Sequence, residues 1–406
     1  MALILSCSYV LHELLSANLD LLYFPSLVLI FVDIYKNKRL TVKALGYIYL
    51  VVLYALLQIV LNDQIEIPRL VINVAKIFLN VFLFIQIKES KIPLPVWRKM
   101  AVYSSLLHVF LLAVSLAFKT EWLWRLDETV NIYQKTRLSL LYFEPSEASF
   151  HAALLVLLLV FFVLREKSGS RNLLHFALIG TNLVIVVLSA GMGGMFSLSL
   201  ACVVMYLFYL KENFSTVRVL GLIALTFLAV LSVLAVVNSN NSFYLRFNDI
   251  VNGNDGSVVY RFNVSFRVMK QMLLDTHYFG VGFGNLNTDT IHNAYAGFGL
   301  VDVISNSFMY ALAEGGWLML LLLAVFFLSL ILPVRPEEKI LKYALLFFIV
   351  SYQIAGGYFT NPVNWIVYGI IANPYLLRHS RSPNPVPAEN LPAAAVQSTG
   401  TLELKS

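Results

Sequence analysis

The sequence predicts an all-α membrane protein with about twelve transmembrane helices and two long loops on one side of the membrane. Hydrophobic residues make up 59% of the 406 residues and charged residues only 13%, whereas a soluble domain has about 25% charged residues. Apolar runs of membrane-crossing length also recur along most of the chain. So much apolar surface requires lipid as its solvent, which excludes an ordinary soluble protein, and we expect no nucleic-acid partner.

The predicted spans are apolar stretches of roughly 17–25 residues, the length that crosses a bilayer. The weakest candidate is 3–17, at the start of the chain. The others are 20–35, 43–62, 69–88, 99–118, 147–164, 173–191, 193–210, 217–238, 306–333, 339–356 and 361–377. Residues 1–378 thus form one transmembrane domain. Residues 379–406 contain four prolines among Ala, Ser and Asn and are predicted to be a disordered tail.

Basic residues in the loops predict the orientation, because Lys and Arg concentrate in cytoplasmic loops. Nineteen of the 29 fall on one side, one (Lys76) lies inside a span, and nine fall on the other side. The richer side is predicted to be cytoplasmic, with both termini there. The nine on the outer side are Arg69, Lys119, Arg125, Lys135, Arg137, Arg246, Arg261, Arg267 and Lys270.

The two long outer loops, about 119–146 and 239–305, hold all of these nine except Arg69. Long connections are uncommon and tend to be functional or disordered. Neither loop has low complexity, and both interleave basic residues with aromatic residues. We therefore predict that the working site lies on the outer face.

The second loop contains Arg246, Tyr260 and Arg261, followed by an amphipathic stretch at 264–274 that predicts a surface helix. A guanidinium group forms paired hydrogen bonds with phosphate oxygens, and fixed positive charge stabilises a departing phosphate. Arg246 and Arg261 are therefore candidate catalytic residues that clamp a diphosphate, and Tyr260 is a candidate substrate contact. Binding of lipid headgroups or structural carboxylates by the two arginines is the alternative.

The first loop ends at Glu144-Pro145-Ser146-Glu147, directly before an apolar span. One carboxylate, Glu144 or Glu147, is a candidate base for a hydroxyl group, and Arg137 a candidate phosphate or sugar contact. The same residues also make a good helix start, since acids and proline favour the first turn. Stabilisation of that helix is the alternative role.

A third candidate segment opens the span at 306–333. Ser305 and Asn306 are candidate substrate contacts or helix caps. Glu314 lies deeper in the span. Placing a carboxylate in a membrane span costs free energy, so Glu314 is a candidate functional group. His292 is a further candidate for substrate binding or acid–base chemistry. No His, Cys or carboxylate cluster has metal-ligand spacing, so neither a metal nor another cofactor is expected.

With these residues in view, the chain resembles the Wzy-type polysaccharide polymerases, in the superfamily that also contains the O-antigen ligases. The resemblance covers roughly 130–375. It is carried by the aromatic-Glu-Pro segment at 142–145, the small-residue turn at 188–194, the paired Arg246 and Arg261, the glycine-rich turn at 278–284, and Asn306, Ser307 and Glu314. Met192 stands where a basic residue is often found. Ser305 replaces the histidine of the ligases, which favours polymerase over ligase.

The resemblance implies a metal-independent, multi-spanning (GT-C-like) glycosyltransferase in the bacterial inner membrane. It would join undecaprenyl-diphosphate-linked oligosaccharide repeat units into a surface or exopolysaccharide at the periplasmic face. Its implied partners are the lipid-linked oligosaccharide, membrane lipid, a chain-length-regulating co-polymerase and a flippase of the same pathway.

Two alternatives stay open. An O-antigen ligase, which transfers finished glycan to a lipid A core, shares the donor chemistry. A lipid-linked oligosaccharide flippase belongs to a different class, and it would be expected to have two similar halves and charged residues facing a central cavity. No half-repeat is evident in the sequence.

Overall fold

The computed structural model describes residues 2–14, 20–37, 42–62, 65–89, 92, 94–126, 136–165, 169–212, 214–216, 242–301, 304, 306–331, 339–356 and 360–374. The predicted span at 217–238, the tail at 379–406 and Ser305 lie outside these residues.

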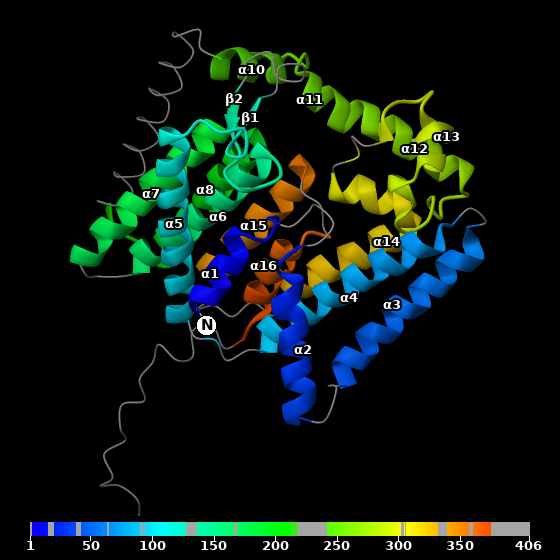
Figure 1. The fold of residues 1–406 in the computed structure, drawn as a ribbon, viewed down its shortest axis with the longest axis horizontal. Coiled ribbons are helices and arrows are strands. Elements are labelled where there is room, and N and C mark those ends of the chain that lie inside the picture. The colour runs from blue at the N-terminus through cyan, green and yellow to red at the C-terminus, as the bar shows by residue number, and fades with distance from the viewer. Residues whose placement is uncertain are drawn as a thin grey trace, which may run out of the picture.

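The described chain is mainly helical, as predicted (Figure 1). The long helices are α2 (Tyr23–Asn37), α3 (Val42–Leu61), α4 (Ile67–Glu89), α5 (Leu94–Ala117), α6 (Pro145–Arg165), α7 (Gly169–Ser189), α8 (Met192–Glu212), α14 (Ser307–Ile331) and α15 (Lys339–Ala355). The shorter elements are α1 (Ala2–Val10), α10 (Ser242–Val251), α11 (Gly256–Val258), the π-helical turn η1 (Val259–Val264), α12 (Ser265–Asp275), the 3-10 turn η2 (Asn285–Asn287), α13 (Asp289–Tyr295) and α16 (Pro362–Ala372).

Five of the described helices, α4, α5, α6, α8 and α14, are long and apolar enough to cross a membrane. They correspond to the predicted spans at 69–88, 99–118, 147–164, 193–210 and 306–333. The chain is therefore a helical membrane protein.

Two local predictions need correction. The candidate span at 3–17 is not one helix, because α1 ends at Val10 and a turn follows at 11–14. Nine helical residues rise about 13 Å, too little to cross a bilayer. The first long loop also contains an antiparallel pair of strands, β1 (Trp124–Leu126) and β2 (Thr136–Leu138), with Arg125 opposite Arg137. The surface helix predicted at 264–274 is confirmed as α12.

The centre of the main apolar core is α6, which contacts α5, α7, α8 and α15. Every residue of α6 from Ala148 to Leu159 is buried, and a helix that is apolar on all sides is expected to lie inside its bundle. Because α6 begins at Pro145, its central position also fixes the acidic segment that immediately precedes and starts it.

A second apolar core lies under the 242–304 segment, where α12, α13 and the first half of α14 pack together with Leu70 of α4. In this region α14 is broken at Gly316, whose backbone has φ 62° and ψ −157°. The glycine-rich turn at 280–284 packs against the break: the Val281 amide donates to the Ala313 carbonyl at 2.8 Å and the Gly282 amide to the Glu314 carbonyl at 2.9 Å.

Candidate functional site

Two of the predicted arginines bond to backbone carbonyls where α7 ends and the turn to α8 begins, and a serine of α6 bonds to the next carbonyl. Arg137 Nε donates to the Ser189 carbonyl at 3.0 Å, and Arg246 Nη1 donates to the Ala190 carbonyl at 3.3 Å. Ser149 of α6 donates to the third carbonyl, that of Gly191, at 3.0 Å. The last carbonyls of a helix have no partner within it and carry partial negative charge, so they attract cations.

Close packing makes this turn possible. Ala190 has a left-handed backbone (φ 48°), which turns the chain sharply out of α7. A Cβ added to Gly191 would lie 2.3 Å from the Ser149 Cβ, so only glycine fits against α6 there. The small residues at 189–191, noted in the sequence, therefore allow the start of α6 and the end of α7 to meet.

The third arginine, Arg261, is held at the end of α15, where its Nη1 donates to the Ala355 carbonyl at 2.7 Å. A Cβ on Gly193, in the first turn of α8, would lie 3.0 Å from the Ala355 Cβ. The start of α8, which follows the end of α7 directly, therefore meets the end of α15. The three arginines thus bond to carbonyls of the same region of the fold, although Arg137 and Arg261 are more than 120 residues apart in the sequence.

Arg246 is also paired with a carboxylate. Its Nε lies 3.3 Å from Asp255 Oδ2, and Asp255 accepts from the Val258 amide at 2.9 Å as the N-cap of α11. The side chains of Arg246 and Asp255 are 15% and 3% exposed. Arg261 lies one turn further on, in the π-helical turn η1, a conformation that is found frequently at functional sites.

The predicted acids lie at the start of α6 and are joined by an acid that the sequence argument did not single out. Glu13 Oε2 accepts from the Phe143 amide at 2.7 Å, and Glu147 Oε2 accepts from the Glu144 amide at 3.2 Å. Because Phe143 and Glu144 are consecutive, the two carboxyl groups that accept from their amides lie close together. Glu144 is exposed and accepts from the Ser146 hydroxyl at 3.0 Å.

Tyr352 of α15 is near both the acids and one of the arginines, Arg261. Its ring stacks on Phe150 with centroids 3.8 Å apart, and the charged groups around its hydroxyl are Glu147, Glu13, Glu144 and Arg261. We call Arg137, Arg246, Arg261, Glu13, Glu144 and Glu147 together the junction site, because they meet where α7 and α15 end and α6 begins.

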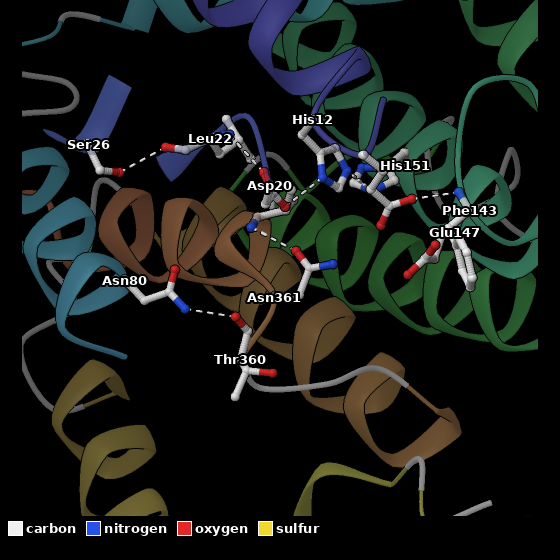
Figure 2. Close-up of polar contacts among 12 residues, drawn as sticks. His12, Asp20, Leu22, Ser26, Asn80, Phe143, Glu147, His151, Thr360 and Asn361 are labelled. Carbon is white, nitrogen blue, oxygen red and sulfur yellow. Dashed lines mark hydrogen bonds and ion pairs between the residues drawn. The ribbon is translucent and has the colours of Figure 1, made fainter. Parts of the chain in front are cut away.

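A buried polar network lies beside the acids (Figure 2). His12 Nδ1 is 2.8 Å from Asp20 Oδ2, and His12 Nε2 is 3.0 Å from His151 Nε2. The His151 ring stacks on Tyr142 with centroids 4.5 Å apart. Both histidines are fully buried. Segments that are distant in the sequence are thus joined directly by polar side chains inside the apolar bundle.

The network continues through Tyr142, which precedes α6. Its hydroxyl is 2.9 Å from His108 Nε2, and His108 Nδ1 is 2.8 Å from Asn182 Oδ1. Burial raises the pKa of the Tyr142 hydroxyl well above its ordinary value, and the nearby Tyr9, Glu13 and Glu147 add to the shift. Tyr142 therefore stays neutral at physiological pH.

Asn306 lies next to the junction site but acts as a cap. Its Oδ1 accepts from the amides of Phe308 and Met309 at 3.0 and 3.3 Å, and its amide donates to the Ile354 carbonyl at 3.1 Å. It therefore ties the start of α14 to the end of α15, beside the carbonyl that holds Arg261. Tyr260 is 46% exposed, on the same turn as Arg261.

Two predicted residues lie elsewhere, in the second core. Glu314 has no exposed surface, and its Oε1 accepts from the Tyr310 hydroxyl at 2.8 Å. His292 Nε2 lies 2.8 Å from the Leu286 carbonyl, within the loop that packs over α14. The structure does not bring either residue to the arginines.

Sequence reasoning missed Glu13, His12 and His151. Glu13 and His12 follow a short apolar helix and His151 lies within a span, so no local pattern distinguishes them from isolated polar residues. The one signal in the sequence was that ionisable side chains lie in or beside apolar segments. Such groups cost free energy there, are rare, and are usually functional.

No protein-family model matches this chain, and no curated protein sequence matches it significantly.

Proposed function

We propose that this protein is a polysaccharide polymerase that joins undecaprenyl-diphosphate-linked oligosaccharide repeat units. The observation that supports this is the junction site, in which three guanidinium groups lie beside three carboxyl groups at the ends of apolar helices. A lipid-linked sugar diphosphate is the kind of substrate that would place an anionic group there and a lipid tail between helices.

The reaction that fits these groups is a displacement at the anomeric carbon of the donor glycan. A hydroxyl of the incoming repeat unit forms the new C–O bond while the bond to the diphosphate breaks. The departing undecaprenyl diphosphate takes the electron pair, and the hydroxyl proton goes to a carboxylate. Guanidinium groups that are already in place stabilise the developing charge without reorganisation.

Arg261 is the best suited to this role. Among the described residues its guanidinium bonds to a carbonyl and not to a carboxylate, so its positive charge is not neutralised. A guanidinium group has five N–H donors, and this bond uses one of them. A diphosphate can therefore be bound without breaking the contact that orients Arg261.

The proposal includes the finer topology: about twelve spans, the junction site at the periplasmic face of a bacterial inner membrane, and both termini in the cytoplasm. It also includes a chain-length-regulating co-polymerase and a flippase as partners in the pathway. Cysteine-accessibility mapping of positions 143 and 261 tests the sidedness, and labelling of both positions from the cytoplasmic side would contradict it.

Deletion of the gene, followed by gel analysis of lipid-linked glycans, tests the reaction. We expect the mutant to accumulate or transfer single repeat units and to recover long chains when the gene is restored. Retention of long polymer on the lipid would identify a ligase instead. Repeat units trapped in the cytoplasmic leaflet would identify a flippase.

A further inference from the structure

We propose that Glu13, whose carboxyl group lies beside that of Glu147, is the base that takes the proton from the attacking hydroxyl. This inference rests on the proposed function and names a residue for its proton transfer. It assigns a catalytic role to the segment after α1, which is 130 residues away from the rest of the acidic cluster in the sequence.

The placement of the two carboxyl groups follows from the backbone before α6. Phe143 and Glu144 are consecutive, and each donates its amide to a different carboxyl group: Phe143 to Glu13 at 2.7 Å and Glu144 to Glu147 at 3.2 Å. Neighbouring amides that point to two acceptors bring those acceptors side by side.

Two adjacent carboxylates do not both ionise readily, which divides them into one acid and one base. Glu13 makes the shorter bond to a backbone amide, 2.7 Å against 3.2 Å for Glu147, so its carboxyl group is held more firmly beside the start of α6. Of the two, Glu13 is therefore the better placed to act as the base.

The buried histidines hold Glu13 in place. His12 precedes it directly and is fixed on both ring nitrogens, by Asp20 at 2.8 Å and by His151 at 3.0 Å. His151 lies on α6 one turn after Glu147, so the same helix carries both Glu147 and the anchor of the Glu13 segment. Figure 2 shows His12, His151 and Glu147 in this arrangement.

The groups that face the carboxyl pair allow the step. They are Glu144, the hydroxyls of Tyr142 and Tyr352, and Arg261 beyond Tyr352. Both tyrosines are buried. In the reaction the acceptor O–H bond breaks as the new C–O bond forms, and the proton moves to Glu13. The diphosphate that leaves carries its electron pair toward the arginines.

The test uses the full chain reconstituted in lipid nanodiscs, with undecaprenyl-diphosphate-linked repeat units extracted from the deletion strain. Polymer formation is followed by gel, and binding of undecaprenyl diphosphate is measured separately. We expect Glu13→Gln, which keeps the shape of the side chain, to lower the rate of polymer formation about 100-fold, as loss of a general base does. Binding of undecaprenyl diphosphate should stay within about twofold of wild type, because the base does not hold the diphosphate.

Glu13→Asp and Glu121→Gln complete the experiment. Glu13→Asp keeps the carboxylate and should retain clearly more activity than Glu13→Gln, whereas Glu121→Gln removes an exposed carboxylate from the loop that follows α5 and should have no effect. A Glu13→Gln protein with wild-type polymer formation would overturn the inference alone. So would equal inactivity of both Glu13 variants together with loss of binding, since that indicates a structural role. Wild-type protein that forms no polymer would overturn the proposed function as well.

Discussion

The junction site and the break in α14 both lie where helices are interrupted, but they differ in the charged groups that they hold and in the exposure of those groups. At the junction site, arginines bond to the backbone carbonyls that end α7 and α15. At the break, the carboxyl group of Glu314 is fully enclosed beneath the turn at 280–284.

The difference separates a site that can act on a ligand from one that supports the fold. A guanidinium group that bonds to a carbonyl keeps its charge and most of its donors, whereas a carboxyl group sealed in protein has no surface for a ligand. We therefore expect substitutions at the junction site to lower activity in folded protein, and substitutions at the break to lower stability first.

The largest expected effect is that of Arg261→Ala. Loss of one preorganised positive group costs about 10²–10³-fold in rate in comparable transition states, so polymer formation should fall by that factor while the protein stays folded. Gel analysis of polymer formed by the reconstituted variant measures it. Arg267→Ala, which removes an exposed arginine from α12, is the matched control. Polymer of normal chain length from Arg261→Ala would contradict the view that the junction site acts on a ligand and the break in α14 does not.

At the break, Gly316→Ala should destabilise the folded protein by roughly 1–3 kcal/mol, because this backbone conformation is nearly restricted to glycine. A Cβ there would lie 2.0 Å from the Tyr278 carbonyl oxygen. The melting temperature in detergent measures the loss. Gly253→Ala is the control, since Gly253 also has positive φ (72°) but no neighbour within 4 Å. Equal melting temperatures for the two variants would show that close packing at the break contributes little.

The smallest expected effect comes from Asp255, which divides its contacts between Arg246 and the cap of α11. Asp255→Ala should lower polymer formation up to about tenfold, since loss of an N-cap typically costs about 1 kcal/mol and Arg246 would keep only the Ala190 carbonyl. Asp255→Asn keeps one acceptor oxygen and replaces the other with an NH2 donor, so it can keep the cap of α11 while losing the contact to Arg246, and its activity should lie between wild type and Asp255→Ala. A loss in Asp255→Asn as large as that in Asp255→Ala would show that the contact to Arg246 carries the effect, and wild-type activity would show that the cap of α11 does.

Apolar length was enough to predict the helices, because a run of 20 apolar residues has few stable alternatives in lipid. The grouping of Arg137, Arg246 and Arg261 with Glu144 and Glu147 was predicted only as a shared outer face. Their convergence depends on the turn at 189–191, whose small residues were visible in the sequence although their contacts were not.

The contacts of Glu13 and His12 could not be predicted, because they join residues 130 and 139 positions apart. No periodic pattern encodes such a pairing. The break at Gly316 was also missed, since 306–333 is continuous in hydropathy, although the Gly315-Gly316 pair was a local signal. The strands at 124–126 and 136–138 are too short for alternation to reveal them.

The π-helical turn that carries Arg261 has one consequence for how the protein tolerates insertions and deletions. A π-turn is an α-helix with one residue too many, so removing one of the residues 262–264, between Arg261 and α12, would allow a regular helix to run into α12. Each residue of an α-helix turns the side chain by about 100°. Such a deletion would leave the surface helix and its apolar contacts in register and rotate the Arg261 guanidinium group away from the Ala355 carbonyl.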